Sequence, residues 1–586
     1  MPRIQEIIHK FEEGEWTWTL KALVGLLLAV TLTAWYDFNE YQNFKSAEAM
    51  ETAQLARNLA RGEGFTTKCI RPLTIALVEQ HQGPASRIGR KPHPDLNTPP
   101  VYPVLLAGLM KVLPLNYDIT ARYWRYQPEV LIALFNQGLF FLTIGLTALL
   151  ARRLFDPSVA LVTAIVLLGC DLLWRFSVSG LSTCLLLLIL VSLLWVLVWL
   201  DQGAQDGQRK TGWFVGLGIL AGVLIGLGAL TRYAFGWLLL PVLGYFVAFL
   251  GGRRWIVGIA TVLTFLALLT PWMARNYMLS GTPFGVPGYA VHQDTLPYPE
   301  ARLERTLRPD LSKIEGRDYF RKIVSNAGDV VSNEVPRLGG GSWVTAFFMA
   351  GLFLRYRSAV LGRLRLFLIA ALLVLIAVQA AGRTHLTADS PTINSENLMV
   401  LLVPPVFMFG TALFFVLLEQ LRPAILEIRY LVIVGFIALA SSPLVFTLMP
   451  PRSYPITYPP YLPPWIQESA RYLRDDEMMM SDMPWAVAWY GDRNCIWTTL
   501  DTSRSFFTIH DEHKLVSALY LTPLTTDARF LTQILQSPDY EWSRFAAEVL
   551  TRTNLPTQFP LRHARKKYTP DQLLLCDRPR WQEGLR

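Results

Sequence analysis

Apolar residues gather in long runs that recur from Leu20 to Pro450 of the 586-residue chain. A helix needs roughly 20 predominantly apolar residues to cross a bilayer core of about 30 Å. About eleven such runs occur, at 18–36, 129–151, 157–175, 180–201, 212–231, 234–250, 254–274, 342–356, 363–381, 397–419 and 428–449. The pattern therefore predicts an α-helical membrane protein with about eleven transmembrane helices.

The pattern changes after residue 450. A proline-dense stretch, residues 451–463, cannot continue a helix and predicts a linker. Residues 464–586 then alternate helical and strand patterns, with a helix over 464–474, strands at "EMMMSD", "NCIWTT", "ALYLTP" and "QLLLCD", and a short helix at "PWAVAWYGD". This alternation predicts a small C-terminal α/β domain.

Basic residues predict the orientation of the membrane body, residues 1–450. Cytoplasmic loops carry an excess of Lys and Arg, and every second loop holds such residues: Arg152 and Arg153, Arg209 and Lys210, Arg253 and Arg254, Arg355 to Arg365, Arg422 and Arg429. The N-terminus is then cytoplasmic, and the C-terminal domain and the loops 37–128, 275–341 and 382–397 are extracytoplasmic. A charged stretch before the first run, with no cleavage site after it, indicates a span rather than a signal peptide. We expect a multi-pass protein of a bacterial-type plasma membrane.

Composition narrows the function classes. The chain is 52% hydrophobic and only 17% charged, and its net charge of +9 is mostly explained by the cytoplasmic loops. No basic patch with interleaved aromatic residues indicates a nucleic-acid partner. Walker, dinucleotide-fingerprint, HExxH and GxSxG motifs are missing, which argues against ATP-driven transport and common hydrolase or zinc chemistry. We predict no cofactor and no metal ligands, and leave dependence on a divalent metal open. Among the five cysteines, a disulfide between Cys495 and Cys576 is an open possibility.

Two acids, Glu48 and Glu51, begin a predicted helix over 47–61, with Ser46 as its N-cap and glycines at 62 and 64 as stops. At 100° per residue both acids share a face with Leu55 and Leu59, and the opposite face carries Met50, Gln54, Arg57 and Arg61. The leucine face is expected to pack on the protein. The acids then either complement the helix dipole or have a function, because an inward acid is costly to desolvate unless it is paired or used.

Four stretches carry a resemblance to a known superfamily. "EAMETAQLARNLARGEGF" (48–65) resembles the first outer loop of GT-C type polytopic glycosyltransferases, which include protein O-mannosyltransferases and aminoarabinose transferases. "NTPPVYPVLLAGLMKV" (97–112) is similar to the superfamily's P-P-x-Y-P entry to an outer amphipathic helix, and "PWMARNYMLSGTPF" (271–284) to its P-W-x-x-R-N-Y segment. "ALTRYAFGWLLLP" (229–241) is similar to its T-R-P-x-G span junction, with Tyr233 in place of proline. The resemblance covers the chain to about residue 285.

The resemblance implies a chemistry. Such enzymes move a sugar from a polyprenyl-phosphate donor, held at the membrane lipid, to a hydroxyl of a lipid, glycan or protein acceptor outside the cytoplasm. The superfamily's catalytic Asp aligns with Glu48, and its usual following Glu aligns with Ala49. Glu48 is therefore the first candidate for the catalytic base, with Glu51 or Asp37 as alternatives. Candidates for binding the lipid phosphate are Arg232, Arg275, Asn276, Arg337, Arg383 and His385.

Other interpretations stay open. Arg275 is also placed to cap its span, and Asp171 with Arg175 is expected to form a local polar pair. Asp482, Trp485, Trp489 and Tyr490 belong either to the core of the C-terminal domain or to an acceptor platform. The protein as a whole could instead be a transporter or lipid flippase, which would share the spans, or a non-catalytic scaffold for envelope assembly. Ionisable groups gather toward the outer side rather than in mid-span, which favours the transferase.

Overall fold

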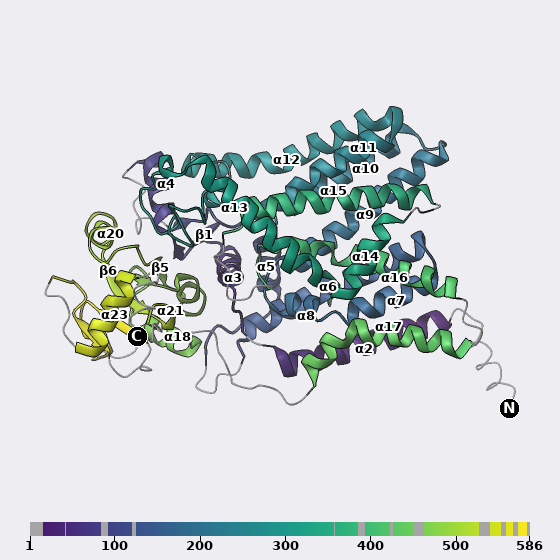
Figure 1. Ribbon diagram of the computed structural model, residues 1–586. Coiled ribbons are helices and arrows are strands. Elements are labelled where there is room, and N and C mark those ends of the chain that lie inside the picture. Colours follow the sequence, from purple (N-terminus) through teal and green to yellow (C-terminus); the bar gives the residue numbers. More distant parts are fainter. Residues whose placement is uncertain are drawn as a thin grey trace.

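A computed structural model shows a body of long helices with a smaller α/β layer at one end (Figure 1). It describes residues 16–41, 43–83, 92–119, 125–340, 342–354, 356, 358–384, 393–421, 426–449, 462–526, 540–552, 558–565 and 572–582. Most of the predicted linker, 451–463, lies outside these residues.

Helices occupy every predicted span. They are α2 (Trp16–Glu40), α6 (Gln127–Leu154), α7 (Pro157–Leu168), α8 (Asp171–Val178), α9 (Thr183–Asp206), α10 (Thr211–Ala229), η2 (Tyr233–Leu238), α11 (Leu239–Phe249), η3 (Gly251–Arg253), α12 (Arg254–Ser280), α14 (Ser342–Phe353), α15 (Ala359–Gly382), η8 (Met399–Leu402), α16 (Val403–Leu421) and α17 (Leu426–Leu448). Within the described part of the chain, seven helices are long and apolar enough to cross a membrane, or eight if the pair α7 and α8, bent by 54°, is one span. The chain is thus an integral membrane protein, while the count of eleven stays a prediction.

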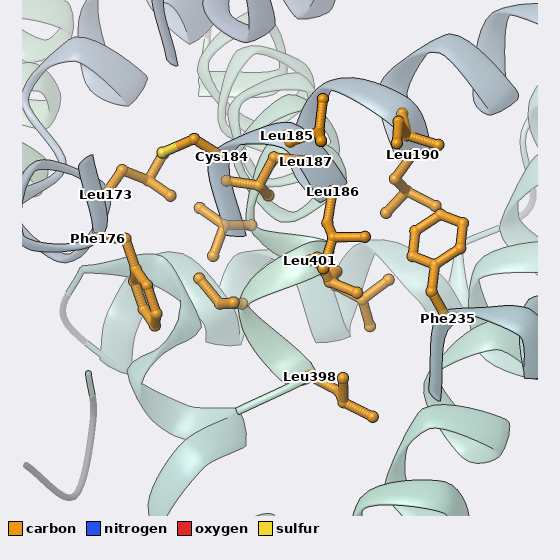
Figure 2. Close-up of a cluster of buried hydrophobic side chains, with 14 of the residues drawn as sticks. Leu173, Phe176, Cys184, Leu185, Leu186, Leu187, Leu190, Phe235, Leu398 and Leu401 are labelled. Atoms are coloured by element: carbon orange, nitrogen blue, oxygen red, sulfur yellow. The ribbon is translucent and has the colours of Figure 1, made fainter. Parts of the chain in front are cut away.

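Close packing between α10 and α12 depends on small residues. A Cβ atom on Gly222 would lie 2.5 Å from the carbonyl oxygen of Thr261, and one on Gly218 would lie 2.9 Å from that of Val257. The Thr261 hydroxyl also donates to the Gly218 carbonyl at 2.8 Å. Glycines let two membrane helices approach closely enough for such contacts. Buried apolar side chains fill the region around α9: Figure 2 shows Leu186, Leu190, Phe235 and Leu401 packed together.

The loops that were predicted to be extracytoplasmic contain short helices and strands. The first loop holds α3 (Ala47–Ala60), β1 (Thr66–Thr67), β2 (Cys69–Ile70), α4 (Pro72–Gln82), β3 (His93–Pro94) and α5 (Val101–Val112), and β1 pairs with β3. The second holds η4 (Val286–Tyr289), η5 (Leu311–Lys313), α13 (Gly316–Asp329), η6 (Val330–Glu334) and η7 (Val335–Gly339). The two loops are tied by the Arg71–Glu304 ion pair. They therefore lie at the same end of the body.

The C-terminal layer contains the four predicted strands. Its elements are α18 (Pro463–Arg471), β4 (Met478–Ser481), α19 (Pro484–Ala486), η9 (Val487–Gly491), β5 (Asn494–Trp497), α20 (Arg504–Phe507), η10 (Thr508–His513), β6 (Val516–Leu521), α21 (Pro523–Thr526), α23 (Tyr540–Arg552), β7 (His563–Arg565), β8 (Leu573–Cys576) and η11 (Arg580–Gln582). The six-stranded sheet has the order β2-β5-β4-β6-β8-β7. Its edge strand β2 comes from the first loop, so this layer is completed by a segment some 400 residues away in sequence.

Strand order rules out the disulfide between Cys495 and Cys576 that the sequence left open. Cys495 lies on β5 and Cys576 on β8, and the strands β4 and β6 separate them. Neighbouring strands are about 4.8 Å apart, so the two cysteines are far beyond the Cα separation of about 4.4–6.8 Å that a disulfide spans. Both thiols are free and buried. The sequence left this pairing open because it does not show which strands are neighbours.

Candidate active site

Glu48 lies in the first turn of α3, close to the predicted start of the helix. Ser46 takes the N-cap position with extended backbone, but its hydroxyl makes no capping hydrogen bond. The Glu48 side chain is 34% exposed, and its Oε1 lies 3.4 Å from Nη2 of Arg232, whose side chain is largely buried. The carboxylate thus has one cation beside it and an open side.

Arg232 is held at the junction of three segments. Its backbone N–H donates to the Gly228 carbonyl at 2.8 Å, which ends α10, and the Val101 N–H donates to the Leu230 carbonyl at 3.0 Å. On α5, the Tyr102 hydroxyl donates to Asn136 Oδ1 at 3.0 Å. The P-P-x-Y-P and T-R-Y stretches therefore meet here and set the distance between Glu48 and its cation.

Glu51 points inward, as predicted, but its oxygens are occupied. Arg71 Nη2 donates to Oε1 at 2.7 Å and to Oε2 at 3.0 Å, and the Asn97 amide donates to Oε2 at 3.1 Å. Burial raises the pKa of Glu51, against the lowering effect of Arg71. Arg71 also pairs with Glu304. This buried cluster joins the two outer loops, so Glu51 has a structural role.

Asp37 lies near the end of α2. Its Oδ1 accepts a hydrogen bond from Gln137 Nε2 at 2.6 Å, and its backbone carbonyl accepts one from Arg125. The side chain thereby links the first span to α6. Among the three candidate acids, Glu48 keeps its carboxylate least occupied.

Arg275 and Asn276 hold loops together. Arg275 donates to the carbonyls of Asp95 at 2.7 Å and Phe65 at 3.1 Å, and its guanidinium lies 4.6 Å from the ring centroid of Trp272. Asn276 is buried and accepts a hydrogen bond from Arg275 at 2.8 Å. The P-W-x-x-R-N-Y segment (271–284) thus positions the first loop on α12.

The other predicted cations have different surroundings. Arg337 is exposed in η7, and Arg383 donates to Glu334 Oε1 at 3.3 Å. His385 lies outside the described residues. Asp171 and Arg175 form the predicted pair, at 2.7 Å. The structure does not bring Arg337 or Arg383 into contact with Glu48.

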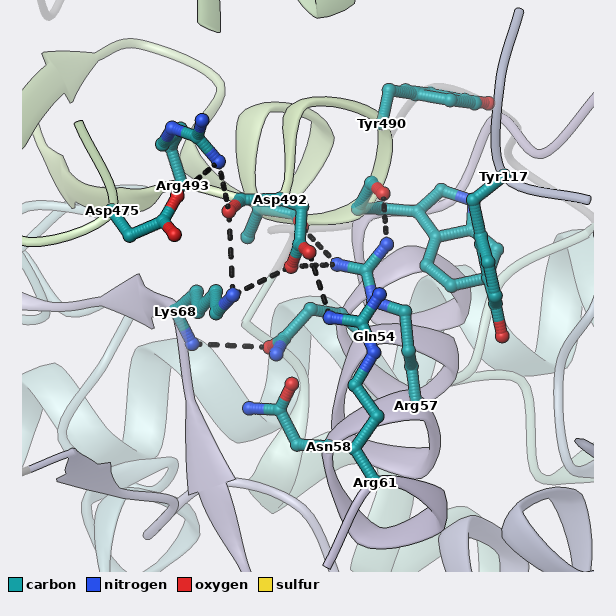
Figure 3. A network of polar contacts seen from close by, with 12 residues as sticks. Gln54, Arg57, Asn58, Arg61, Lys68, Tyr117, Asp475, Tyr490, Asp492 and Arg493 are labelled. Atoms are coloured by element: carbon teal, nitrogen blue, oxygen red, sulfur yellow. Dashed lines mark hydrogen bonds and ion pairs between the residues drawn. The ribbon is translucent and has the colours of Figure 1, made fainter. Parts of the chain in front are cut away.

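A clasp that the sequence did not reveal covers the other face of α3 (Figure 3). Asp492, at the end of η9, pairs with Arg57 at 2.9 Å, Arg61 at 2.7 Å and Lys68 at 2.6 Å. Arg57 also donates to the carbonyls of residues 488 and 489. Met50, Gln54 and Arg57 are consequently buried, so the expectation that only the leucine face packs on the protein was wrong: the C-terminal layer covers the opposite side.

Glu129, in the first turn of α6, is a second buried contact point between distant segments that the sequence analysis missed. Its Oε2 accepts from the Phe44 N–H at 2.7 Å, and its Oε1 accepts from Trp489 Nε1 at 2.8 Å and the Tyr490 hydroxyl at 2.7 Å. Phe44 lies three residues before the start of α3. An acid in the opening turn of an apolar run was the one signal available, since its partners come from distant segments.

The residues that could have formed an acceptor platform, Asp482, Trp485, Trp489 and Tyr490, pack within the C-terminal layer or against its neighbours. Trp489 and Tyr490 are buried, and Trp485 packs edge-on against Trp497 at 5.3 Å. Asp482 is buried and accepts from the Thr522 N–H at 2.9 Å and the Thr525 hydroxyl at 2.8 Å. These contacts favour the core interpretation over an acceptor platform. Across the described residues, no group of three or more His, Cys, Asp or Glu could hold a metal ion.

Comparisons with known proteins bear on the fold of the chain. Residues 125–274 match the family described as dolichyl-phosphate-mannose-protein mannosyltransferase. No curated protein sequence matches the chain significantly.

Several solved structures share the fold. ArnT from Cupriavidus metallidurans, bound to undecaprenyl phosphate, is 11% identical with a TM-score of 0.54, and the match covers 95% of this chain and 98% of that one. The Archaeoglobus fulgidus oligosaccharyltransferase tethered with an acceptor peptide is 13% identical with a TM-score of 0.55, over 92% and 72% of the two chains. The same enzyme, AglB, in complex with an inhibitory peptide and a dolichol-phosphate is 12% identical with a TM-score of 0.54, over 90% and 72%. The chain therefore shares its fold with these membrane glycosyltransferases, and its residues 125–274 match the mannosyltransferase family.

Proposed function

We propose that the protein transfers a sugar from a polyprenyl-phosphate donor to a hydroxyl of a lipid, glycan or protein acceptor on the extracytoplasmic side of the membrane. One observation carries the proposal: the half-exposed carboxylate of Glu48 lies 3.4 Å from the guanidinium of Arg232, at the end of the helical body. The chemistry of the transfer needs a base and a cation at one place.

Glu48 is the proposed general base. It accepts the proton of the acceptor hydroxyl as that oxygen forms a bond to the anomeric carbon of the sugar. The bond between that carbon and the phosphate oxygen breaks, and the polyprenyl phosphate leaves with the electron pair. A positioned carboxylate contributes about 10²–10⁴-fold to such a step.

Arg232 is the proposed partner of the leaving phosphate. A guanidinium stays charged and binds phosphate oxygens in pairs. Its position beside Glu48, together with the bonds that fix its backbone, favours it over Arg275, whose guanidinium is engaged with two carbonyls. Arg337, exposed in η7, is a second proposed contact for the donor.

The donor and acceptor classes draw on the neighbours. ArnT was solved with undecaprenyl phosphate and AglB with a dolichol-phosphate and a peptide. Lipid-linked phosphate is the chemistry that these ligands share. We extend this lipid-phosphate chemistry to this chain. The proposal also includes a cytoplasmic N-terminus, about eleven membrane spans and an extracytoplasmic α/β domain at 464–586. The contacts between loops 37–128 and 275–341 and the C-terminal layer support placing all three on one side.

The proposal is tested with purified full-length protein in lipid nanodiscs. Polyprenyl phosphates carrying radiolabelled hexoses or pentoses are offered with lipid, glycan and peptide acceptors. We expect labelled product and free polyprenyl phosphate from at least one donor, a loss of turnover in Arg232→Gln, and partial recovery in Arg232→Lys. Movement of intact donor across vesicle membranes without bond cleavage would instead support a lipid flippase. If neither sugar transfer nor donor movement is detected, the result would favour a non-catalytic scaffold.

A further inference from the structure

Helix α13 is amphipathic, but its apolar face points outward and its polar face points toward the protein. Phe320, Ile323 and Val324 on α13, and Val331 in the π-helical turn η6 that follows it, recur at helical spacing, and all four are exposed, Phe320 by 71% and Val324 by 54%. A helix on a water-soluble surface presents the opposite arrangement, with apolar residues inward. Some apolar medium is therefore expected to cover this face.

The inner face of α13 is polar, and its groups are engaged. Lys322 is buried, and its ammonium donates to the carbonyls of Ala290 at 2.8 Å, Val291 at 3.3 Å and Gln293. Burial lowers the pKa of Lys322 to about 8. Because three carbonyls hold this ammonium, the helix is fixed with its apolar side outward.

The same inner face attaches α13 to a membrane span. Asn326 is buried and donates to the carbonyl of Ala380, in the last turn of α15, at 3.0 Å. On α15 itself, Leu366 and Leu373 are exposed, as expected where a span meets lipid. Figure 1 shows α13 at the end of α15 that is nearer to the C-terminal layer. The outward face of α13 thus continues a lipid-facing surface at the level where hydrocarbon meets water.

Two arginines border the apolar face. On the helical wheel, Arg317 and Arg321 follow Phe320 and Val324 on one flank, and both are exposed. In-plane helices that lie in a bilayer interface combine an apolar face with basic residues beside it, which contact lipid headgroups. Long basic side chains at this depth reach the phosphates.

We propose that α13 lies in the plane of the outer leaflet, with Phe320, Ile323, Val324 and Val331 inserted among the acyl chains. The occupant of this face is bilayer lipid, and the proposal holds whichever sugar or acceptor the protein uses. The second outer loop is then anchored to the membrane at two places: through Asn326 to the span α15, and through the apolar face to lipid.

Spin labels test the immersion of this face. Phe320→Cys and Val324→Cys are labelled in the full-length chain and reconstituted in vesicles of phosphatidylethanolamine and phosphatidylglycerol. Ser325→Cys, exposed on the same helix but away from the apolar face, is the matched control, and Lys313→Cys is the reference for water. The unmodified chain, whose five cysteines are buried, gives the background.

Collision rates with oxygen, which dissolves in hydrocarbon, and with a water-soluble nickel chelate decide the outcome. We expect the ratio of oxygen to nickel collisions at 320 and 324 to be several-fold higher than at 325 and 313. Ratios at 320 and 324 equal to that at 313 would overturn the proposal, because the face would then be in water. Low collision rates with both reagents would also overturn it, because protein would then cover the face.

Discussion

Asp492→Asn removes the negative charge at the centre of the clasp between α3 and the C-terminal layer. Asp492 contacts Arg57, Arg61 and Lys68 at 2.6–2.9 Å and has a left-handed backbone, with φ of 54°. Asparagine tolerates that conformation as aspartate does. The substitution therefore tests the charge and leaves the turn unchanged.

The structure gives the size of the effect. Burial alone raises the pKa of Asp492, but Arg57, Lys68 and Arg61 outweigh it and lower the pKa from 3.8 to about 2. That difference corresponds to about 2 kcal/mol of stabilisation at neutral pH. Breaking a fully buried ion pair costs about 3–5 kcal/mol. The lower figure is reasonable because the Asp492 side chain is 29% exposed and Arg57 keeps its bonds to two carbonyls.

The dependence on pH follows from the sign of this shift. The folded pKa of Asp492 is lower than the unfolded one, so the stabilisation is fully present above the unfolded pKa and is lost as pH falls through about 2. By the same relation, about half of it remains at pH 3.

Thermal unfolding of the detergent-solubilised chain measures the effect at pH 7 and pH 3, with Asp476→Asn, an exposed acid of the same layer, as control. We expect the Tm of Asp492→Asn to fall by roughly 2 °C at pH 7 and by about half as much at pH 3, with little change in the control. An unchanged Tm at pH 7, or an equal drop at both pH values, would refute the reasoning.

Three further substitutions separate structural from catalytic roles. Glu129→Gln leaves a buried donor of Phe44, Trp489 or Tyr490 without its acceptor, at a cost of about 1–3 kcal/mol, and limited proteolysis is expected to cut the C-terminal layer faster; an unchanged cleavage rate contradicts the anchoring role. Glu51→Gln uncouples the buried pair with Arg71, and we expect a lower Tm, whereas sugar transfer lost at an unchanged Tm would identify Glu51 as the working acid. Arg275→Gln loses its hold on two carbonyls, so turnover measured in folded protein should fall through a higher KM for donor, and a pure loss of kcat would point to direct catalysis.

The sequence predicted those features that depend on local patterns, namely the positions of helices and strands. Apolar runs located the helices of the body, and the strand patterns located β4, β5, β6 and β8. The assignment of Glu48, made from its helix and the surrounding motif, stays a prediction. Contacts between distant segments were not predictable: β2 joins the C-terminal sheet with two residues, Asp492 reaches three cations over 400 positions away, and Glu129 binds groups from two remote segments. The periodicity of a sequence contains no information on such long-range contacts, because they depend on how distant segments are arranged in the fold.

The most direct test of the catalytic assignment compares Glu48→Gln with Glu63→Gln, an exposed acid of the same loop, in the transfer assay with polyprenyl-phosphate sugars. Equal Tm values for both variants and the unmodified chain would establish that each is folded. We predict that Glu48→Gln lowers kcat by about 10²–10⁴-fold while Glu63→Gln retains full turnover. Full turnover in folded Glu48→Gln would contradict the account, since the base would then have to be another group.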